Sequence, residues 1–264
     1  MKVIKNTLSM DVGQKRKKML FVYRYREYSS FNIRCLEHSF INGSLFKTFS
    51  DKDLGEMNYG FSNQFIKKIA ATQKDAENFT NAIINNTKKN YYLACFTLNP
   101  PRPDSVEWNK YAKGNGYCLV YRIIDIQKEI EKQVLKYNRT IMFKNVNYSD
   151  NLFLLDCVAN ELLGIIKKYG IDTSEELDNK FSIQVNKDIG KHACKAFFHK
   201  SMNYRNFNEM RVVELDKNNN NPNYKDCLLV VKPIKIVIKK SPMPLDYSKI
   251  IRTAKQNGIP WEFI

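Results

Sequence analysis

No common catalytic or phosphate-binding motif occurs in this chain. Neither GxxxxGKS/T nor GxGxxG is present, so the usual glycine-rich loops that cradle phosphates are absent. GxSxG and HExxH, which mark nucleophile-elbow hydrolases and zinc peptidases, are missing too. The histidines His38, His192 and His199 do not cluster, and the cysteines form no CxxC or CxxH pair. We therefore expect no metal site.

The chain also lacks a long apolar run. No stretch of about 18 apolar residues occurs, so we expect no transmembrane span and no membrane partner. The basic N-terminus, MKVIKNTLSMDVGQKRKKML, has no uninterrupted apolar core, so we expect no secretory signal. The scattered cysteines fit reduced, mostly buried thiols, and together these features predict a cytoplasmic protein.

Positive charge, in contrast, is in excess. The chain has 43 Lys and Arg residues against 27 Asp and Glu, a formal net charge of +16. Such an excess favours a polyanionic partner, which would be nucleic acid, an anionic membrane or an acidic protein. The alternative is a lysine-rich composition that puts lysine wherever the surface allows, and the abundant asparagine fits that alternative.

Hydrophobic residues make up 43% of the chain, enough for a proper core, and their spacing predicts strands and helices that mix without strict βαβ alternation. We predict strands at 19–25, 91–98, 117–123, 207–216 and 227–240 (the last half-exposed), with a short strand inside 141–150. We predict helices inside 30–46, then at 61–86, 105–113 (capped by Ser105 or Asp104), 124–136, 151–170 (ended by Gly170), from Thr173 onward, at 192–200 and at 247–258. The fold class is therefore α+β, as one domain over residues 1–264 with a basic arm at 1–18.

Two segments put chemically useful side chains on strands. In VYRYREYSSFN, Tyr23 and Tyr25 take one face of a strand while Arg24 and Arg26 take the other. This is either an exposed basic face over an aromatic core or a pair of arginines aimed at phosphate or ribose. In NFNEMRVVEL, Glu209 precedes an apolar run, either as a solvated strand start or as a catalytic or ribose-binding carboxylate.

A third segment, CFTLNPPRPDSVEWNKYAKGNGYCLVYRI, combines a strand, a proline-rich loop, a short helix and another strand. Trp108 and Tyr111 lie three positions apart on the helix and share a face. They either pack in the core or form a wall for a planar ring.

The three segments, in this order, resemble a widespread bacterial family classed as a domain of unknown function, with the signature KYR, CFS…WxxYA…G and YExExR. The resemblance covers most of residues 20–240, and VNYSD (146–150) falls where that family often has V-x-Y. The same blocks resemble the motif layout of ADP-ribosyltransferases of the poly-ADP-ribose polymerase branch. The matching residues are Arg24-Tyr25-Arg26, Cys95-Phe96-Thr97, Trp108, Tyr111, Ala112, Gly116, Glu209 and Arg211.

The chain departs from these patterns at three points. Phe207 stands where the family has its first acidic residue, so only Glu209 remains and paired-glutamate chemistry is not expected. The first block has no histidine, so Arg24, Tyr25 or Arg26 would take its role. Thr97 replaces a serine.

The resemblance implies a split β-sheet core with peripheral helices and NAD as the substrate. Glu209, Tyr111 and Arg26 would be catalytic, with Glu209 stabilising the positive charge that builds on the ribose and Tyr111 stacking on nicotinamide. It also implies NAD-binding roles for further residues: Arg24, Tyr25, Thr97, Trp108 and Arg211.

The acceptor is predicted from charge. A net charge of +16 favours nucleic acid, RNA over DNA, above a basic protein. By analogy, an enzyme that modifies nucleic acid would be the toxin of a toxin–antitoxin or phage-defence system, with an acidic antitoxin as a further partner. Two alternatives stay open, namely a non-catalytic nucleic-acid-binding module and an NAD glycohydrolase.

Overall fold

The computed structural model describes residues 20–45, 74, 78, 91–114, 116–137, 139–149, 153–171, 188, 197–200, 202–215, 227–240 and 247–264. The predicted basic arm (1–18), nearly all of the predicted helix 61–86 and the predicted helix start at Thr173 lie outside these residues.

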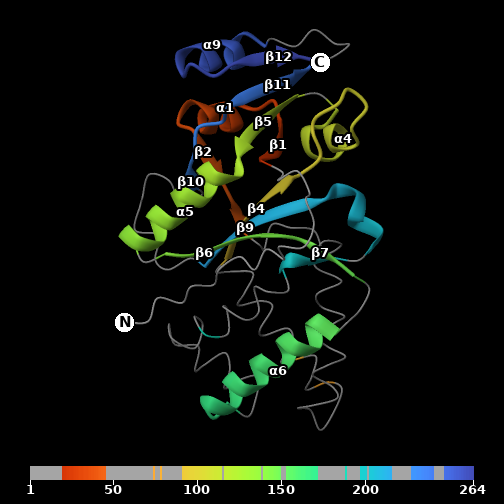
Figure 1. Cartoon of the computed structure of the whole chain (residues 1–264), viewed down its shortest axis with the longest axis vertical. Coiled ribbons are helices and arrows are strands. Elements are labelled where there is room, and N and C mark those ends of the chain that lie inside the picture. Colours follow the sequence, from red (N-terminus) through yellow and green to blue (C-terminus); the bar gives the residue numbers. More distant parts are fainter. Residues whose placement is uncertain are drawn as a thin grey trace.

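An eight-stranded mixed sheet forms the centre of the described structure (Figure 1). Its strands lie in the order β12-β11-β5-β1-β4-β9-β6, with β3 also paired to β4. β11 and β12 are parallel, and the other pairs are antiparallel. The bounds are β1 Phe21–Glu27, β3 Ser44–Leu45, β4 Tyr91–Thr97, β5 Gly116–Arg122, β6 Thr140–Asn145, β9 Glu209–Leu215, β11 Lys235–Lys239 and β12 Trp261–Phe263.

Smaller elements surround this sheet. β2 (Phe40–Asn42) pairs with β10 (Cys227–Val230), and β7 (Asn147–Tyr148) pairs with β8 (His199–Lys200). The described helices are α1 Ser30–Glu37, α4 Glu107–Ala112, α5 Ile123–Tyr137, α6 Phe153–Lys168, the 3₁₀ helix η3 Met202–Phe207 and α9 Ser248–Gln256. This mixture of segregated helices and a largely antiparallel sheet confirms the predicted α+β class.

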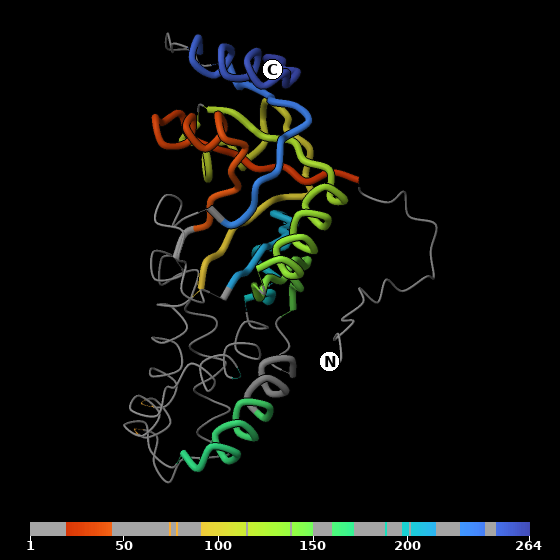
Figure 2. The backbone as a smooth tube through the Cα atoms, turned by 90° about the vertical axis from the view of Figure 1, so that its left-hand side faces the viewer, coloured from red at the N-terminus to blue at the C-terminus, as the bar shows by residue number. Residues whose placement is uncertain are grey.

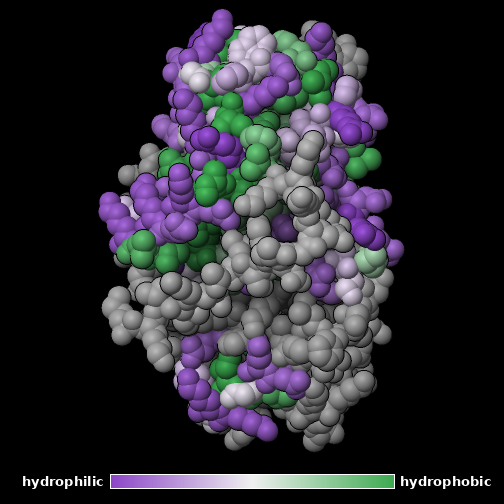
Figure 3. All heavy atoms as spheres, viewed as in Figure 1, coloured by the Kyte–Doolittle hydropathy of each residue, from purple (hydrophilic) through white to green (hydrophobic). Residues whose placement is uncertain are grey.

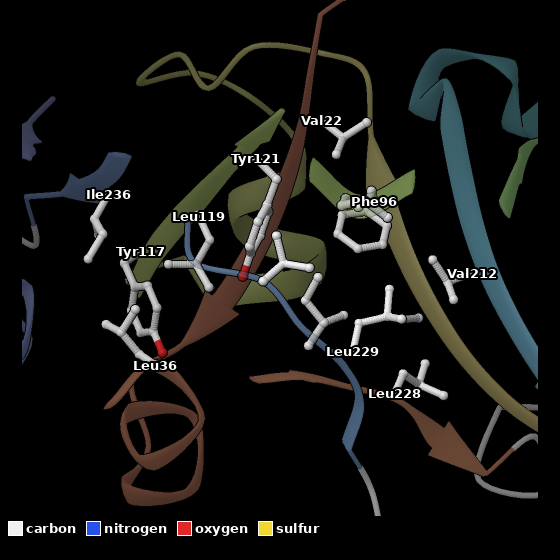
Figure 4. Packing of buried hydrophobic residues seen from close by; sticks show 14 of the residues in the cluster. Val22, Leu36, Phe96, Tyr117, Leu119, Tyr121, Val212, Leu228, Leu229 and Ile236 are labelled. Atoms are coloured by element: carbon white, nitrogen blue, oxygen red, sulfur yellow. The ribbon is translucent and has the colours of Figure 1, made fainter. Parts of the chain in front are cut away.

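Helices cover both faces of the sheet. On one face, side chains of α1, α5 and α9 join those of the strands in the larger hydrophobic cluster, and Figure 2 shows α5 and α9 along this side. Figure 4 shows its centre, where Leu36 of α1 lies beside Tyr117 of β5, and Tyr121 of β5 lies between this pair and Phe96 of β4. On the other face, α4 packs Trp108 into a smaller cluster. Each fully buried aliphatic side chain contributes about 1.5–3 kcal/mol.

The outer helices are amphipathic. α9 buries Ile250 and Ala254 while Lys249 and Arg252 stay exposed, and Figure 3 shows hydrophilic side chains over the regions of α9 and α5. Within the described residues, no helix has the length and apolar character needed to cross a membrane.

The sheet opens between β1 and β4. β1 pairs with β5 along its whole length, from Phe21 opposite Arg122 to Glu27 opposite Gly116. It pairs with β4 only at Tyr23 opposite Thr97. The two strands therefore diverge on one side of that contact, and the sheet is split into a β12-β11-β5-β1 part and a β4-β9-β6 part.

Several sequence predictions hold. The predicted strands at 91–98 and 117–123 are β4 and β5, and the predicted helices at 124–136 and 247–258 are α5 and α9. Gly170, two residues after the end of α6, is the C-terminal cap as predicted, with a φ of +59°. The N–H groups of Gly170 and Ile171 donate to Lys167 and Ile166, the bonding pattern of a Schellman cap.

Other predictions are wrong. The segment 227–240 is not one half-exposed strand. Residues 231–234, which include Pro233, separate β10 from β11, and the two strands belong to different sheets. Ile236, Val237 and Ile238 of β11 are all buried. Lys200 lies in β8 and not in a helix. No side chain caps α4, since the Ser105 hydroxyl accepts instead from the N–H of Arg102. The parallel strand β12 was not predicted at all.

Candidate active site

Glu209 begins β9, and its carboxylate is the centre of a buried polar cluster. The residue is only 3% exposed. The Tyr111 hydroxyl and the Lys200 ammonium donate to Oε1 over 3.1 and 3.0 Å. Arg211 donates to Oε2 from Nε at 3.2 Å and from Nη2 at 2.9 Å. Each carboxylate oxygen thus accepts two hydrogen bonds, most of them charge-assisted, and the carboxylate is firmly oriented.

A tight turn before β9 determines where Glu209 lies. η3 ends at Phe207, and Asn208 follows with a φ of +44°, a left-handed conformation that asparagine adopts more readily than most residues. The Thr97 hydroxyl donates to the Phe207 carbonyl over 2.7 Å, and the Leu98 N–H donates to the Asn208 carbonyl over 2.9 Å. The end of β4 therefore holds the start of β9 in place.

The charges around Glu209 keep it ionised. Burial by itself would raise its pKa, but Arg211 and Lys200 outweigh burial and lower the pKa below the ordinary value of 4.5. Burial, with the Glu209 charge second, raises the pKa of Tyr111 well above its usual value, so the phenol keeps its proton and donates. Burial likewise raises the pKa of Tyr148 to about 12, and its hydroxyl accepts from the Glu209 N–H over 2.8 Å.

A cavity of about 190 Å³ lies in the split between β1 and β4. Residues 23–26 of β1 line one side, residues 93–97 of β4 line the other, and Tyr111 of α4 adds its ring. These residues come from both faces of the sheet, so the cavity passes between the two diverging strands. Tyr111 therefore belongs both to this cavity and to the Glu209 cluster.

Two arginines line the cavity without a carboxylate beside them. Arg24, which is 6% exposed, donates from Nη2 to the Asn42 carbonyl and lies over the Phe96 ring at 5.6 Å. Arg26 donates from Nη2 to Asn42 Oδ1 over 2.6 Å. Burial lowers the pKa of Arg26. Neither guanidinium makes an ion pair with any residue that the structure describes, and the predicted alternative of an exposed basic face is wrong.

Trp108 packs in the core beneath α4 and does not line the cavity. Its indole is fully buried, and its Nε1–H donates to the Arg102 carbonyl over 2.7 Å. Tyr25 meets it edge to face with ring centroids 4.7 Å apart. Such a pair contributes about 0.5–1.5 kcal/mol beyond area burial. Of the two predicted wall aromatics, only Tyr111 reaches the cavity.

The predicted site residues divide between the two faces of the sheet. Strand register puts Tyr25, Thr97, Glu209 and Arg211 on the α4 face, together with Tyr111 and Trp108. Arg24 and Arg26 alternate with the tyrosines and take the opposite face. Arg24, Arg26 and Tyr111 nevertheless line the same cavity, which runs through the split.

Sequence reasoning missed Lys200. The parallel pairing of β7 with β8 sets Tyr148 opposite Lys200, and both side chains reach Glu209 from there. Tyr148 could have been identified from the sequence, because it lies in the VNYSD segment that matches the family's V-x-Y. No sequence pattern pointed to Lys200, which lies in a segment that was predicted to be helical.

No group of three or more His, Cys, Asp or Glu side chains in the described part of the chain is arranged to hold a metal ion. No protein-family model, curated protein or solved structure matches the chain.

Proposed function

We propose that the protein is an NAD-dependent ADP-ribosyltransferase. The observation that carries the proposal is the hydrogen bond from Tyr111 to Glu209, at the rim of a cavity that the buried Arg24 and the half-buried Arg26 also line. An aromatic ring, an ionised carboxylate and paired guanidiniums are the groups needed to bind nicotinamide, ribose and diphosphate. The order of elements, with β1 first, then β4-α4-β5 and finally β9, also fits the motif layout of that superfamily, as does the split sheet.

The arginines favour a phosphate-bearing substrate. A buried charge without a partner is costly, whereas a guanidinium hydrogen-bonded to phosphate oxygens is well satisfied. Arg24 and Arg26 each donate to Asn42 from one nitrogen, Nη2, which leaves further donors for a ligand. The cavity of about 190 Å³ is smaller than the roughly 300–1,000 Å³ of typical ligand pockets, so it would take the diphosphate and not the whole dinucleotide.

The reaction would break the bond between ribose C1′ and the nicotinamide nitrogen, and the electron pair of that bond leaves with nicotinamide. Positive charge builds on the ribose, and the Glu209 carboxylate would stabilise it. A ribose hydroxyl could replace the Tyr111 hydroxyl on Oε1. The acceptor nucleophile then bonds to C1′ and releases its proton to water. Lys200 and Arg211 keep Glu209 ionised and oriented throughout.

We propose nucleic acid as the acceptor, with RNA favoured over DNA, because of the formal net charge of +16. Phosphate contacts of this kind weaken steeply as salt concentration rises. A toxin role would follow from such a modification.

The test is transfer of label from NAD to a cell lysate by the full-length protein, followed by digestion of separate aliquots with RNase, DNase or protease. RNase-sensitive label supports the full proposal, while protease-sensitive label supports the transferase and contradicts the nucleic-acid acceptor. Release of nicotinamide without labelled macromolecule would indicate a glycohydrolase.

Glu209→Gln should abolish transfer. Its matched control is Glu214→Gln, which changes another buried, ion-paired glutamate of the same strand. Circular dichroism checks folding, and Tyr111→Phe serves as the second variant if Glu209→Gln does not fold. Intact NAD with the wild-type protein, or full activity in both variants, would overturn the proposal.

A further inference from the structure

The edge of β4 that faces β1 is covered by a different strand at each end of the split. β9 pairs with the other edge of β4 along its whole length, so β1 and β3 share this one. β1 meets it at Thr97 and β3 meets it at Leu93, and the cavity lies along the stretch between these contacts. Asn42 ends β2, two residues before β3 begins at Ser44. It therefore lies where the chain reaches the far end of the split.

From this position, Asn42 holds both arginines of β1. Its backbone carbonyl accepts from Nη2 of Arg24, and its Oδ1 accepts from Nη2 of Arg26 over 2.6 Å. Asn42 is 8% exposed and does not line the cavity, whereas both arginines do. Asn42 thus fixes the two guanidiniums from outside the cavity, and their other nitrogens stay available to a ligand inside it.

The surrounding chain fixes Asn42 in turn. β2 pairs with β10, with Asn42 opposite Cys227. The next residue is Gly43, where an added Cβ would lie 2.5 Å from Cδ1 of the buried Leu228. The backbone of β2 therefore packs directly against β10, and both acceptor oxygens of Asn42 are in place before a ligand arrives. Such preorganisation favours binding, because less freedom is lost when the ligand enters.

The chemistry of Asn42 suits a pair of cations that has to stay charged. A carbonyl and an amide oxygen accept hydrogen bonds without bringing a negative charge, whereas a carboxylate would neutralise the arginines. Arg24 and Arg26 are two positions apart on one face of a strand, so their Cα atoms are about 6.5 Å apart. Each guanidinium can bind one phosphate group through two hydrogen bonds. Two linked phosphate groups can therefore serve both arginines at once, and a single phosphate serves one of them fully.

We propose that Asn42 is a positioning residue that makes the split selective for a diphosphate over a monophosphate. The inference rests on the proposed function, which puts the diphosphate of NAD in this cavity. Asn42 keeps Arg26 at a separation from Arg24 that two linked phosphate groups bridge, and it leaves both positive charges in effect. The site therefore takes an intact dinucleotide in preference to a nucleoside monophosphate.

The test is binding of inorganic pyrophosphate and of inorganic phosphate to the full-length protein by calorimetry. Asn42→Ala removes the acceptor of Arg26 and keeps the backbone carbonyl that accepts from Arg24. Pyrophosphate affinity should fall about tenfold and phosphate affinity by about twofold or less, since a hydrogen bond to a charged group then matters for one ligand only. The ratio of the two affinities is the readout, because a general loss of structure would weaken both ligands alike.

Asn42→Asp keeps the shape of the side chain and adds a negative charge. The new carboxylate should pair with Arg26, which raises the urea midpoint of unfolding because a buried charge gains a partner. Pyrophosphate should bind about tenfold more weakly or worse, because the carboxylate takes the place of a phosphate group. Stability and binding then change in opposite directions, which a purely structural asparagine would not produce. The control is Asn160→Asp, an exposed position of α6, which adds the same charge and should change neither quantity.

Three outcomes overturn the inference: no pyrophosphate binding by the wild-type protein, a wild-type affinity ratio in Asn42→Ala, or unweakened pyrophosphate binding by Asn42→Asp. If Asn42→Ala does not fold, Asn42→Asp decides. None of these measurements uses NAD. Lost selectivity in Asn42→Ala without NAD cleavage by the wild-type protein overturns only the proposed function, and NAD cleavage with an unchanged ratio overturns only the inference.

Discussion

The hydroxyl of Tyr111 donates to the carboxylate of Glu209 over 3.1 Å, although the two residues are 98 positions apart in the chain. Tyr111 comes from the helix after β4, and Glu209 is the first residue of β9, the neighbour of β4 in the sheet. The bond therefore joins a helix above the sheet to the start of a strand. Because Tyr111 also lines the cavity in the split, a ligand there would sense this contact directly.

Tyr111→Phe removes the donor and leaves the ring. The free energy of unfolding should fall by about 1.5 kcal/mol, the lower range for a hydrogen bond to a charged group, because Lys200 and Arg211 still satisfy the carboxylate. NAD cleavage should fall about tenfold or more, as expected when a catalytic group loses its orientation. Urea unfolding and nicotinamide release measure the two effects.

The control is Tyr137→Phe on α5, where the side chain is 54% exposed. It should change neither quantity. If Tyr111→Phe behaves like this control, the bond to Glu209 has neither a structural nor a catalytic role.

The Glu209 cluster makes stability depend on pH in a defined direction. The pKa of Glu209 is lower in the folded protein than the ordinary 4.5, so the unfolded chain takes up a proton first as pH falls. The stability that Glu209 contributes is complete at neutral pH, begins to decline near 4.5 and is lost as pH falls through the folded-state pKa.

Glu209→Gln should therefore be destabilised at neutral pH by about 3–5 kcal/mol, because the buried Lys200 and Arg211 both lose the carboxylate that pairs with them. The difference from wild type should shrink in acid. Urea unfolding over about pH 3–7 checks both parts. A difference that stays constant over this range would mean that Glu209 does not titrate as its ion pairs require.

The sequence predicts those parts of this site that local patterns mark, and it misses those that depend on pairing between segments far apart in the chain. Glu209 and Tyr111 could be singled out because local patterns mark a strand start and a helix face, and the structure brings them together. The alternation of Arg24 and Arg26 with the tyrosines was also readable, because a strand has a period of two.

Long-range pairing could not be read in the same way. Lys200 reaches Glu209 only because two short strands, β7 and β8, pair in parallel, and a pairing of two residues leaves no periodicity in the sequence.

Pro233 was visible in the sequence, but an apolar run before it and the alternation of isoleucine and lysine after it together resemble one long strand. β11 is buried on both faces because Ile236 and Ile238 pack in the cluster that α9 joins, while Val237 packs in the cluster of Trp108 on the other face. β12 covers its edge, and both β12 and α9 follow β11 in the chain.

Gly116 is one of the residues that match the family signature, and the structure shows why a glycine is needed at this position. Its φ is +153°, and a Cβ there would lie 2.2 Å from the Arg26 carbonyl oxygen. Because β1 and β5 pair at this point, neither strand can retreat without losing register. Gly116→Ala should cost about 2–4 kcal/mol through strain and a backbone clash.

The comparison variant is Gly164→Ala in α6, where a Cβ would meet nothing within 4 Å. It should be neutral or stabilising by up to about 1 kcal/mol, since alanine favours helix. Thermal unfolding measures both variants, and equal stability of the two would show that β5 relaxes around the added methyl group.

Replacing Arg24 tests whether the arginines in the split stabilise the fold or bind a ligand. If its guanidinium served the fold, its replacement by an apolar side chain of similar length should be costly. Arg24 instead has one carbonyl and one aromatic ring as partners, and no carboxylate in the described structure. Removing such a buried charge is often neutral or stabilising. The free energy of unfolding of Arg24→Met, measured in urea, should therefore be higher than that of the wild type or at most about 1 kcal/mol lower.

Ligand binding should respond in the opposite way. Inorganic pyrophosphate should raise the Tm of the wild-type protein, because a ligand that binds only the folded state stabilises it. The rise should be lost in Arg24→Met and kept in Arg122→Met, whose side chain is 55% exposed and outside the split. A large loss of stability in Arg24→Met with an unchanged response to pyrophosphate would make Arg24 a structural residue. The diphosphate would then need another cation. Arg26, which also donates to Asn42, would be the next residue to mutate.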